Sequence, residues 1–295
     1  MEQYYSPSGK FSPTSFVFWI VAAILILPIF AFCYSYAIWY VPIPYLSFFI
    51  TAIFGYLIGY SISFVVKLGK IRNKAIEILF CLLGLLVAVY VHWAVWVDLA
   101  YNISGTIGNE SIGVAKSNVN ITEVISLLLQ PKALLSAILE INSSGVWSIK
   151  GELVSGILLT IVWVIEFLII TVTTLAVGVG QASKPYCEVE NSWFKQNELS
   201  PVSFIETTNK ATLIKALYSG DMETITETLS TVIDAASESH SKITLFDAKH
   251  GENYVSITNE KASTTDKGEI KFDTTTITSY LKIPQETADK LLTIR

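Results

Sequence analysis

The residue with the clearest chemical potential is Glu166, which lies in the apolar stretch 161–170 with no cation near it in the sequence. It stands roughly 20 Å into the last long apolar segment, at 1.5 Å per helical residue. An ionised carboxylate at that depth costs several kcal/mol, so we expect a neutral or hydrogen-bonded group. Tyr56 and Tyr60 reach a comparable depth and are candidate partners. Glu166 is then either a proton- or cation-carrying site or a neutral group that joins helices, and the second interpretation is favoured.

His92 is the second candidate for intramembrane chemistry. Gly84 and Ala88 precede it at four-residue steps, so the imidazole shares a helix face with small residues and points toward another helix. An interhelical hydrogen bond is the favoured role. The functional alternative is a water-linked relay that runs from Asp98 through His92 toward Glu166, since we expect the last two not to touch directly.

Small residues mark one face of the second apolar segment. Thr51, Gly55, Gly59 and Ser63 follow one another at four-residue steps and include a Gly-x-x-x-Gly pair. In an apolar helix this pattern indicates close approach by a second helix. Packing within the chain is favoured over dimerisation, and a homo-oligomer remains the alternative.

Four membrane-spanning helices are needed to position these residues. Hydrophobic residues make up 52% of the 295-residue chain and charged residues 15%, with a mean hydropathy of +0.51. This composition excludes a disordered chain, a nucleic-acid-binding domain and an ordinary cytosolic enzyme over most of the length. Apolar stretches long enough to cross a bilayer occur at 16–41, 46–66, 75–97 and 153–177, and we expect the first to be kinked at Pro28.

The orientation follows from the cations in the short loops. Residues 67–74 carry four cations, whereas the turn at 41–45 carries none, so the former loop faces the cytoplasm. This places the tail 1–15 and the segment 183–295 inside, and the loop 98–152 outside. The sequence thus predicts a multi-pass protein of a bacterial cytoplasmic membrane with both termini cytoplasmic.

The outer loop contains one ambiguous segment, 121–141, which is apolar enough to suggest a fifth span. Charged residues and Pro131 interrupt it, and Asn120 followed by Glu123 resembles a capping box. We therefore expect two amphipathic helices at the outer surface or a re-entrant pair.

The last part of the chain, 183–295, has the pattern of a small α+β domain. It carries 12 cations and 17 anions and so accounts for the whole net charge of −5, which argues against nucleic acid as a partner. A helix over 208–217 should stop at Gly220, and Asp221 should cap a second helix that runs to Ile233. Apolar residues then alternate with polar ones in a three-stranded meander with turns at 249–252 and 266–269, followed by a helix at 284–293.

Motifs for catalysis, cofactors or metals are missing from the sequence. No metalloprotease, phosphate-loop, dinucleotide or nucleophile-elbow pattern occurs, and His240 and His250 stand isolated. Cys33, Cys81 and Cys187 lack a metal-ligand spacing.

The architecture resembles that of many bacterial membrane proteins, and no motif identifies a family. We expect no catalytic, cofactor or metal site. The favoured function is a non-enzymatic scaffold, sensor or accessory component in the lipid bilayer, whose cytoplasmic domain binds a protein partner. The alternative is an oligomeric pore or carrier component with Glu166 in a proton or cation path.

Overall fold

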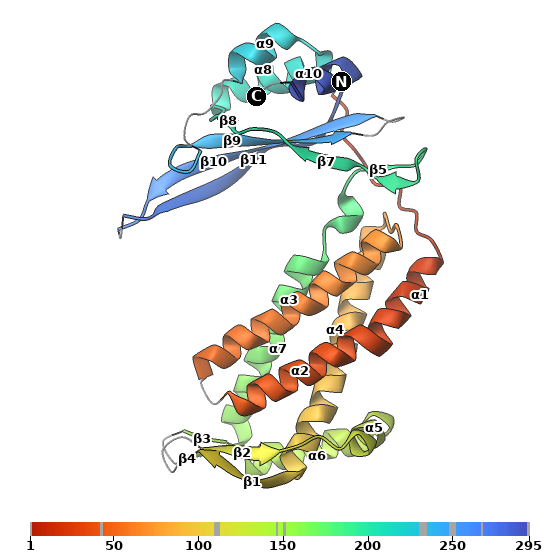
Figure 1. Cartoon of the computed structure of the whole chain (residues 1–295), viewed down its shortest axis with the longest axis vertical. Helices are drawn as coiled ribbons and strands as arrows, with labels where there is room; N and C mark the ends of the chain where they lie inside the picture. The colour runs from red at the N-terminus through yellow and green to blue at the C-terminus, as the bar shows by residue number, and fades with distance from the viewer. Residues whose placement is uncertain are drawn as a thin grey trace. The chain divides into compact units, whose positions relative to one another are not determined.

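The computed structural model describes residues 2–41, 44–108, 113–145, 147–149, 152–229, 235–247, 252–266 and 268–293. The chain forms two compact units, one made of Gly9–Ala182 and the other of Met1–Ser8 together with Ser183–Arg295. The first unit is mainly helical and the second is rich in sheet (Figure 1). The tail predicted at 1–15 is therefore divided, because its first eight residues belong to the unit that contains the C-terminal domain.

Within the described residues, four helices are long and apolar enough to cross a membrane. The first runs over Thr14–Tyr40 and comprises α1 (Thr14–Val21), η1 (Ala22–Ile26) and α2 (Leu27–Tyr40). The others are α3 (Pro44–Leu68), α4 (Lys74–Tyr101) and α7 (Gly156–Gly178). The predicted start of the fourth at 153 is too early, because β4 (Glu152–Val154) pairs with β3 (Trp147–Ile149) in a hairpin before α7 begins.

Pro28 distorts the first helix in the expected place. Proline lacks an N–H, and its ring crowds the carbonyl four residues earlier, so the regular ladder is interrupted there. The turn before it is a π-helix in which the N–H of Leu27 reaches the carbonyl of Ala22. Residues 42–43 of the predicted turn lie outside the described part of the chain.

The helical unit packs around α4, whose buried face meets α2, α3 and α7 (Figure 1). Apolar side chains fill the centre of this packing: Leu27, Ala31, Phe54, Ile58, Leu85, Ala88 and Ile170. Only 11% of the apolar window of the fourth long helix and 22% of that of the first are buried. Their outward faces are nevertheless apolar, which is the composition that suits helices in lipid.

The predicted outer loop, 98–152, contains several short elements. The hairpin of β1 (Ile103–Gly108) and β2 (Gly113–Ser117) precedes α5 (Ile121–Leu129) and α6 (Pro131–Ser144). The Oδ1 of Asn120 accepts the N–H of Thr122 at 3.1 Å, and Pro131 occupies the first turn of α6, so the two predicted short helices are confirmed. The two helices meet at 109°.

The second unit contains a five-stranded antiparallel sheet in the order β11-β10-β9-β7, with β8 also paired to β9. The predicted meander is confirmed as β9 (His240–Asp247), β10 (Asn253–Thr264) and β11 (Ile270–Ile283). The strands β7 (Lys195–Glu198) and β8 (Val202–Ser203) were missed, because the first is entirely polar and the second has two residues. A further small hairpin joins β5 (Tyr186–Cys187) to β6 (Ser192–Trp193).

Three helices cover one face of this sheet: α8 (Thr207–Ser219), α9 (Met222–Thr228) and α10 (Gln285–Leu291) (Figure 1). Gly220 ends α8 in the left-handed region, with φ 79°, and the Oδ1 of Asp221 accepts the N–H of Thr224 at the start of α9, as predicted. The buried core lies between helices and sheet and includes Leu213, Leu217, Ile225, Leu245, Val255, Ile257 and Leu281. The predicted extension of the second helix to Ile233 is wrong, because α9 ends at Thr228 and the backbone of Leu229 is no longer helical. Residues 230–234 and part of the turn at 249–252 lie outside the described residues.

Residues near the N-terminus complete the sheet. Tyr4 forms a β-bridge with Leu281 in antiparallel orientation, so a short stretch of chain lies along the outer edge of β11. No period-two pattern marks residues 2–5, and the sequence therefore gave no signal for this pairing.

Candidate functional site

His92 on α4 is buried and bonded across helices. Its Nδ1 lies 2.8 Å from the Oγ of Ser35 on α2. The Ser35 hydroxyl also donates to the carbonyl of Ala31 at 2.8 Å, so the imidazole Nδ1–H is the donor in the pair. This contact is of the kind that the small-residue face of α4 indicated.

Tyr34, the neighbour of Ser35, joins three helices and was not singled out from the sequence. Its ring stacks on Phe54 of α3 with centroids 4.3 Å apart and lies 4.6 Å from the His92 ring. The Oγ1 of Thr51 donates to the carbonyl of Ser47, which leaves the Tyr34 hydroxyl as the donor in its 3.0 Å bond to Thr51. Both polar side chains are buried.

Glu166 lies on the inward row of α7, which Leu159, Trp163 and Ile170 define at steps of four and three residues. Tyr34 is within electrostatic range of its carboxyl. No residue that the structure describes forms a hydrogen bond with Glu166. Together with Tyr34, Ser35, Thr51 and His92, it makes up a set of polar residues to which α2, α3, α4 and α7 each contribute. We call this set the intramembrane polar cluster.

The structure does not bring Tyr56 or Tyr60 to Glu166. Their rings stack on one another at 6.2 Å, and their side chains are 50% and 57% exposed on the outer face of α3. The step from Gly55 to Tyr56 turns the side chain away from α7, because neighbouring residues on a helix face in directions about 100° apart. Depth alone was therefore a poor guide to the partner of Glu166, and Tyr34 on α2 is the tyrosine near it.

The small residues of α3 face α7 within the same chain. A Cβ on Gly55 would overlap the Oγ1 of Thr173 and lie 2.7 Å from the carbonyl oxygen of Ile170, and one on Gly59 would lie 2.5 Å from the carbonyl oxygen of Thr174. The helices thus approach closely only because these positions are glycine. Ser63 continues the face one turn further and is partly buried.

Asp98 does not connect to His92 through any hydrogen bond between described residues. It lies at the outer end of α4, where its Oδ2 accepts the backbone N–H of Asn120 at 2.8 Å and its Oδ1 accepts the amide of Asn102 at 3.0 Å. The same Asn102 amide donates to Glu123 at 3.2 Å. A cleft of about 190 Å³ lies beside these groups, lined by Asp98, Tyr101, Glu123, Ser126 and Leu127. Asp98 thus fastens the start of α5 to α4, and the water-linked relay stays a prediction.

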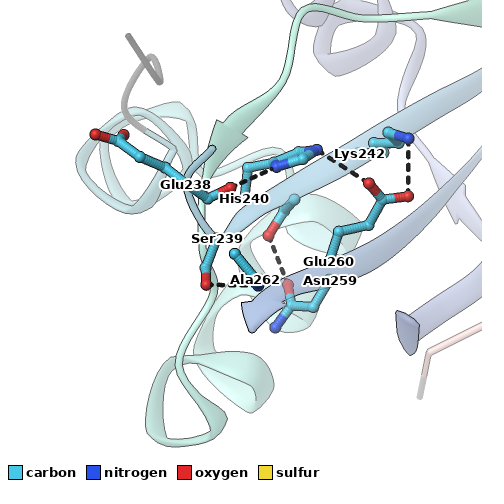
Figure 2. Close-up of polar contacts among 8 residues, drawn as sticks. Glu238, Ser239, His240, Lys242, Asn259, Glu260 and Ala262 are labelled. Atoms are coloured by element: carbon cyan, nitrogen blue, oxygen red, sulfur yellow. Dashed lines mark hydrogen bonds and ion pairs between the residues drawn. The ribbon is translucent and has the colours of Figure 1, made fainter. Parts of the chain in front are cut away.

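The prediction that His240 stands isolated is wrong. His240 begins β9 and faces Glu260 of β10, its direct cross-strand neighbour, with Nε2 3.2 Å from the carboxylate (Figure 2). Its Nδ1 lies 2.9 Å from the carbonyl of Glu238, and Lys242 pairs with the other oxygen of Glu260 at 2.8 Å. Spacing of two between His240 and Lys242 puts both on one face of the strand, but only the strand register reveals Glu260 as their partner. His250 lies outside the described residues.

The chain neighbours of His240 and Glu260, Ser241 and Asn259, also form hydrogen bonds. The Ser241 hydroxyl donates to the side chain of Asn259 at 2.5 Å, and the Asn259 amide donates to the carbonyl of Ile205 at 2.8 Å. Both polar side chains are buried, so their hydrogen bonds fix the positions of β8, β9 and β10. The network contains a base and a carboxylate but no nucleophile in line with them, and its geometry is that of a structural ion network.

Among the described residues, no group of three His, Cys, Asp or Glu side chains is placed to hold a metal ion. The three cysteines are free thiols, with Cys33 exposed and Cys81 and Cys187 buried. No protein-family model matches the chain, and neither the curated proteins nor the solved structures contain one that is detectably similar.

Proposed function

We propose that this protein is a multi-pass membrane protein without catalytic activity, whose C-terminal domain binds a protein partner in the cytoplasm. The observation that carries the proposal is the outer edge of β11. In the sheet order β11 is an edge strand, and within the described chain no strand lies along its outer side from 270 to 278. The side chains of Thr274, Thr275 and Thr276 are exposed.

An edge of this kind offers a row of backbone N–H and C=O groups to an incoming strand. The far half of β11 is exposed on both faces, so a partner strand meets no covering helix there. The pairing of Tyr4 with Leu281 supports the proposal, because the same edge already takes one added stretch of chain.

The second unit contains residues from both ends of the chain, and this supports the proposed number of membrane crossings. Residues 2–8 and the C-terminal domain belong to one folded unit, so they occupy the same compartment. A chain whose two ends share a compartment crosses the membrane an even number of times, which favours four crossings over five. The four cations at 67–74 lie in the loop after the second crossing and favour a cytoplasmic location for both ends. A bacterial cytoplasmic membrane remains part of the proposal.

The test is site-specific photocrosslinking in the organism that makes the protein, with the crosslinker at Thr274 and with paired proline variants. Thr275→Pro and Thr276→Pro remove neighbouring backbone donors, of which one points to β10 and the other to the outer side. The proline variant that removes the outward-pointing N–H should leave the domain folded and abolish the crosslinked product. A folded outward variant that keeps the product at the wild-type level would contradict binding through this edge.

A second function is supported by the intramembrane polar cluster, namely a component of a pore or carrier with Glu166 in a proton or cation path. The observation that favours it is the position of Glu166 on the inward row of α7, within electrostatic range of Tyr34 and with no hydrogen bond from any described residue. An oligomer would have to form through another face than Gly55 and Gly59, because α7 covers that face.

The variant Glu166→Gln separates the two functions of this carboxyl. Glutamine keeps the shape and hydrogen-bonding capacity but cannot titrate. If Glu166 carries protons or cations, the Gln variant should keep its thermal stability in detergent and lose flux in reconstituted vesicles. Glu140→Gln is a matched control, because Glu140 is exposed on α6 and accepts a hydrogen bond from Tyr101. Unchanged flux in Glu166→Gln, or no flux in the wild type, would remove this second function.

A further inference from the structure

Residues 3–5 bind the edge of β11 as an extended peptide would. The N–H of Lys282 donates to the carbonyl of Gln3 at 2.8 Å, and the N–H of Tyr5 donates to the carbonyl of Tyr280 at 2.9 Å. Further along, the hydroxyl of Ser8 donates to Glu188 at 2.7 Å. The stretch is thus held mainly by backbone hydrogen bonds, which any sequence can form.

The side chain of Tyr5 supplies the sequence-dependent part of this contact. Its ring meets Tyr254 edge-on at 5.4 Å and Tyr280 edge-on at 6.3 Å. Phe194 supports Tyr254 at 5.5 Å, and Phe246 supports Tyr280 at 5.1 Å, both also edge-on. We call these four receiving rings the aromatic clasp. Edge-on pairs of this kind favour an aromatic guest over an aliphatic one.

The backbone of β11 is specially shaped at the clasp. Tyr280 has φ 52°, a left-handed conformation that a bulky residue adopts at a cost, and the register with β10 shifts beside it. The N–H of Tyr280 donates to the hydroxyl of Ser256 in place of a ladder partner. The bulge leaves the Tyr280 carbonyl free of the sheet ladder, so that it accepts the N–H of Tyr5. Strain at a contact point of this kind is typical of binding sites.

Two charged residues, Glu252 and Lys282, position one ring of the aromatic clasp and the adjoining end of β11. Glu252 accepts hydrogen bonds from the Lys282 ammonium and the Tyr254 hydroxyl. These contacts fix the Tyr254 ring and the strand end that binds Gln3. The position of the Tyr254 ring in the aromatic clasp is thus fixed by contacts within the domain that do not involve Tyr5.

We propose that the clasp and the adjoining edge of β11 form a binding site for an extended segment of a partner protein that carries an aromatic residue at the position of Tyr5. Residues 2–5 of this chain are then its intramolecular competitor. The inference rests on the proposed function and adds the chemistry of the partner and a means of regulation. The bound stretch uses two backbone hydrogen bonds and one ring, whereas a partner strand that continues along 270–278 gains further hydrogen bonds. A longer partner segment can therefore displace it.

The test uses the full chain in detergent and a fluorescent peptide with the sequence of residues 2–9. In the wild type, the tethered stretch competes at an effective concentration in the millimolar range, so the peptide should bind weakly. Tyr5→Ala weakens the competitor without shortening the chain, and the peptide should then bind at least tenfold more tightly. Tyr45→Ala is the matched control, because Tyr45 is exposed on α3 and belongs to the helical unit, and peptide affinity should stay within about twofold of the wild type.

A second variant tests the clasp directly. Tyr280→Gly removes one ring at a position whose φ suits glycine, so the domain should stay folded. Combined with Tyr5→Ala, it should weaken peptide binding at least tenfold. Equal affinity of the peptide for wild type and Tyr5→Ala, or for Tyr5→Ala with and without Tyr280→Gly, would overturn the inference. A wild type that gives no photocrosslink at Thr274, or a folded outward proline variant that keeps it, would count against the proposed function alone, since the peptide assay does not use that part of the edge.

Discussion

The contact of Gly59 with α7 gives a stability prediction whose size follows from three distances. In Gly59→Ala the new methyl group would lie 2.5 Å from the carbonyl oxygen of Thr174, 3.0 Å from the N of Gly178 and 3.1 Å from the Cβ of Val177. The two nearest atoms belong to the backbone of a helix, so no side-chain rotation relieves them. To restore ordinary contact, α7 must move away by about 1 Å.

Two opposing effects decide whether Gly59→Ala stabilises or destabilises the helical unit. A gap of 0.5 to 1 Å forfeits roughly a quarter to a half of each atomic attraction along the contact. Overpacking of a well-packed core costs about 1–3 kcal/mol, whereas glycine to alanine in a helix gains at most about 1 kcal/mol. We therefore expect Gly59→Ala to destabilise the helical unit by roughly 1–2 kcal/mol.

Gly84→Ala is the matched comparison on α4. Its methyl group would meet only side-chain ends, Ile62 at 2.9 and 3.2 Å and Leu27 at 3.5 Å. Flexible side chains can give way, so the gain in helix propensity offsets the crowding and the net effect should be near zero.

The assay is thermal unfolding of the full chain in detergent, followed by tryptophan fluorescence. Trp93 on α4 and Trp163 on α7 lie 4.8 Å apart and report on the contact between these helices. Gly59→Ala should lower Tm by roughly 2–8 °C, with Gly84→Ala close to the wild type. Equal Tm values for the two variants would refute the argument that backbone contact at Gly59 sets the helix separation.

Two further predictions concern charged residues. Asp98→Ala should destabilise the helical unit by about 1–3 kcal/mol, because the N–H of Asn120 loses its acceptor. Thermal unfolding in detergent measures this loss of stability. An unchanged Tm would show that water replaces the carboxylate. Hydrogen bonds from Lys282 and Tyr254 lower the pKa of Glu252 from its ordinary value of 4.5, so its stabilising effect is present above that pH and is lost as the pH falls through the lowered pKa. Because Glu252 is half exposed, the effect should stay below about 1 kcal/mol. The loss of this stabilisation should appear as faster hydrogen exchange of the Lys282 N–H under acid conditions, after correction for the intrinsic rate. A Glu252→Gln variant should not show this pH-dependent acceleration.

Much of the fold could be predicted because the signals are local. Apolar length gave the four long helices, Gly220 and Asp221 gave a helix boundary, and alternation gave β9 to β11. The polar strand β7 carries no such signal, because its position at the sheet comes from pairing with β9 rather than from burial of its own side chains.

The candidate site was harder to predict because its contacts join distant parts of the chain. His92 could be assigned an interhelical hydrogen bond from the face it occupies, but nothing in the sequence selects Ser35 as its partner. Tyr34 carries no signal of its own, because tyrosine is common near membrane interfaces, and only the packing of α2 brings it within electrostatic range of Glu166.

The pairing of Tyr4 with Leu281 also bears on when the protein becomes complete during synthesis. The ribosome makes residues 2–5 before all four long helices, and it makes Tyr280 to Lys282 only after them. Nearly the whole chain separates the paired segments, so this contact has one of the largest sequence separations in the molecule and forms late in folding. A ribosome-bound chain that ends before β11 therefore presents residues 2–5 without their strand, and Tyr5 lacks its aromatic neighbour Tyr280 until β11 has been made.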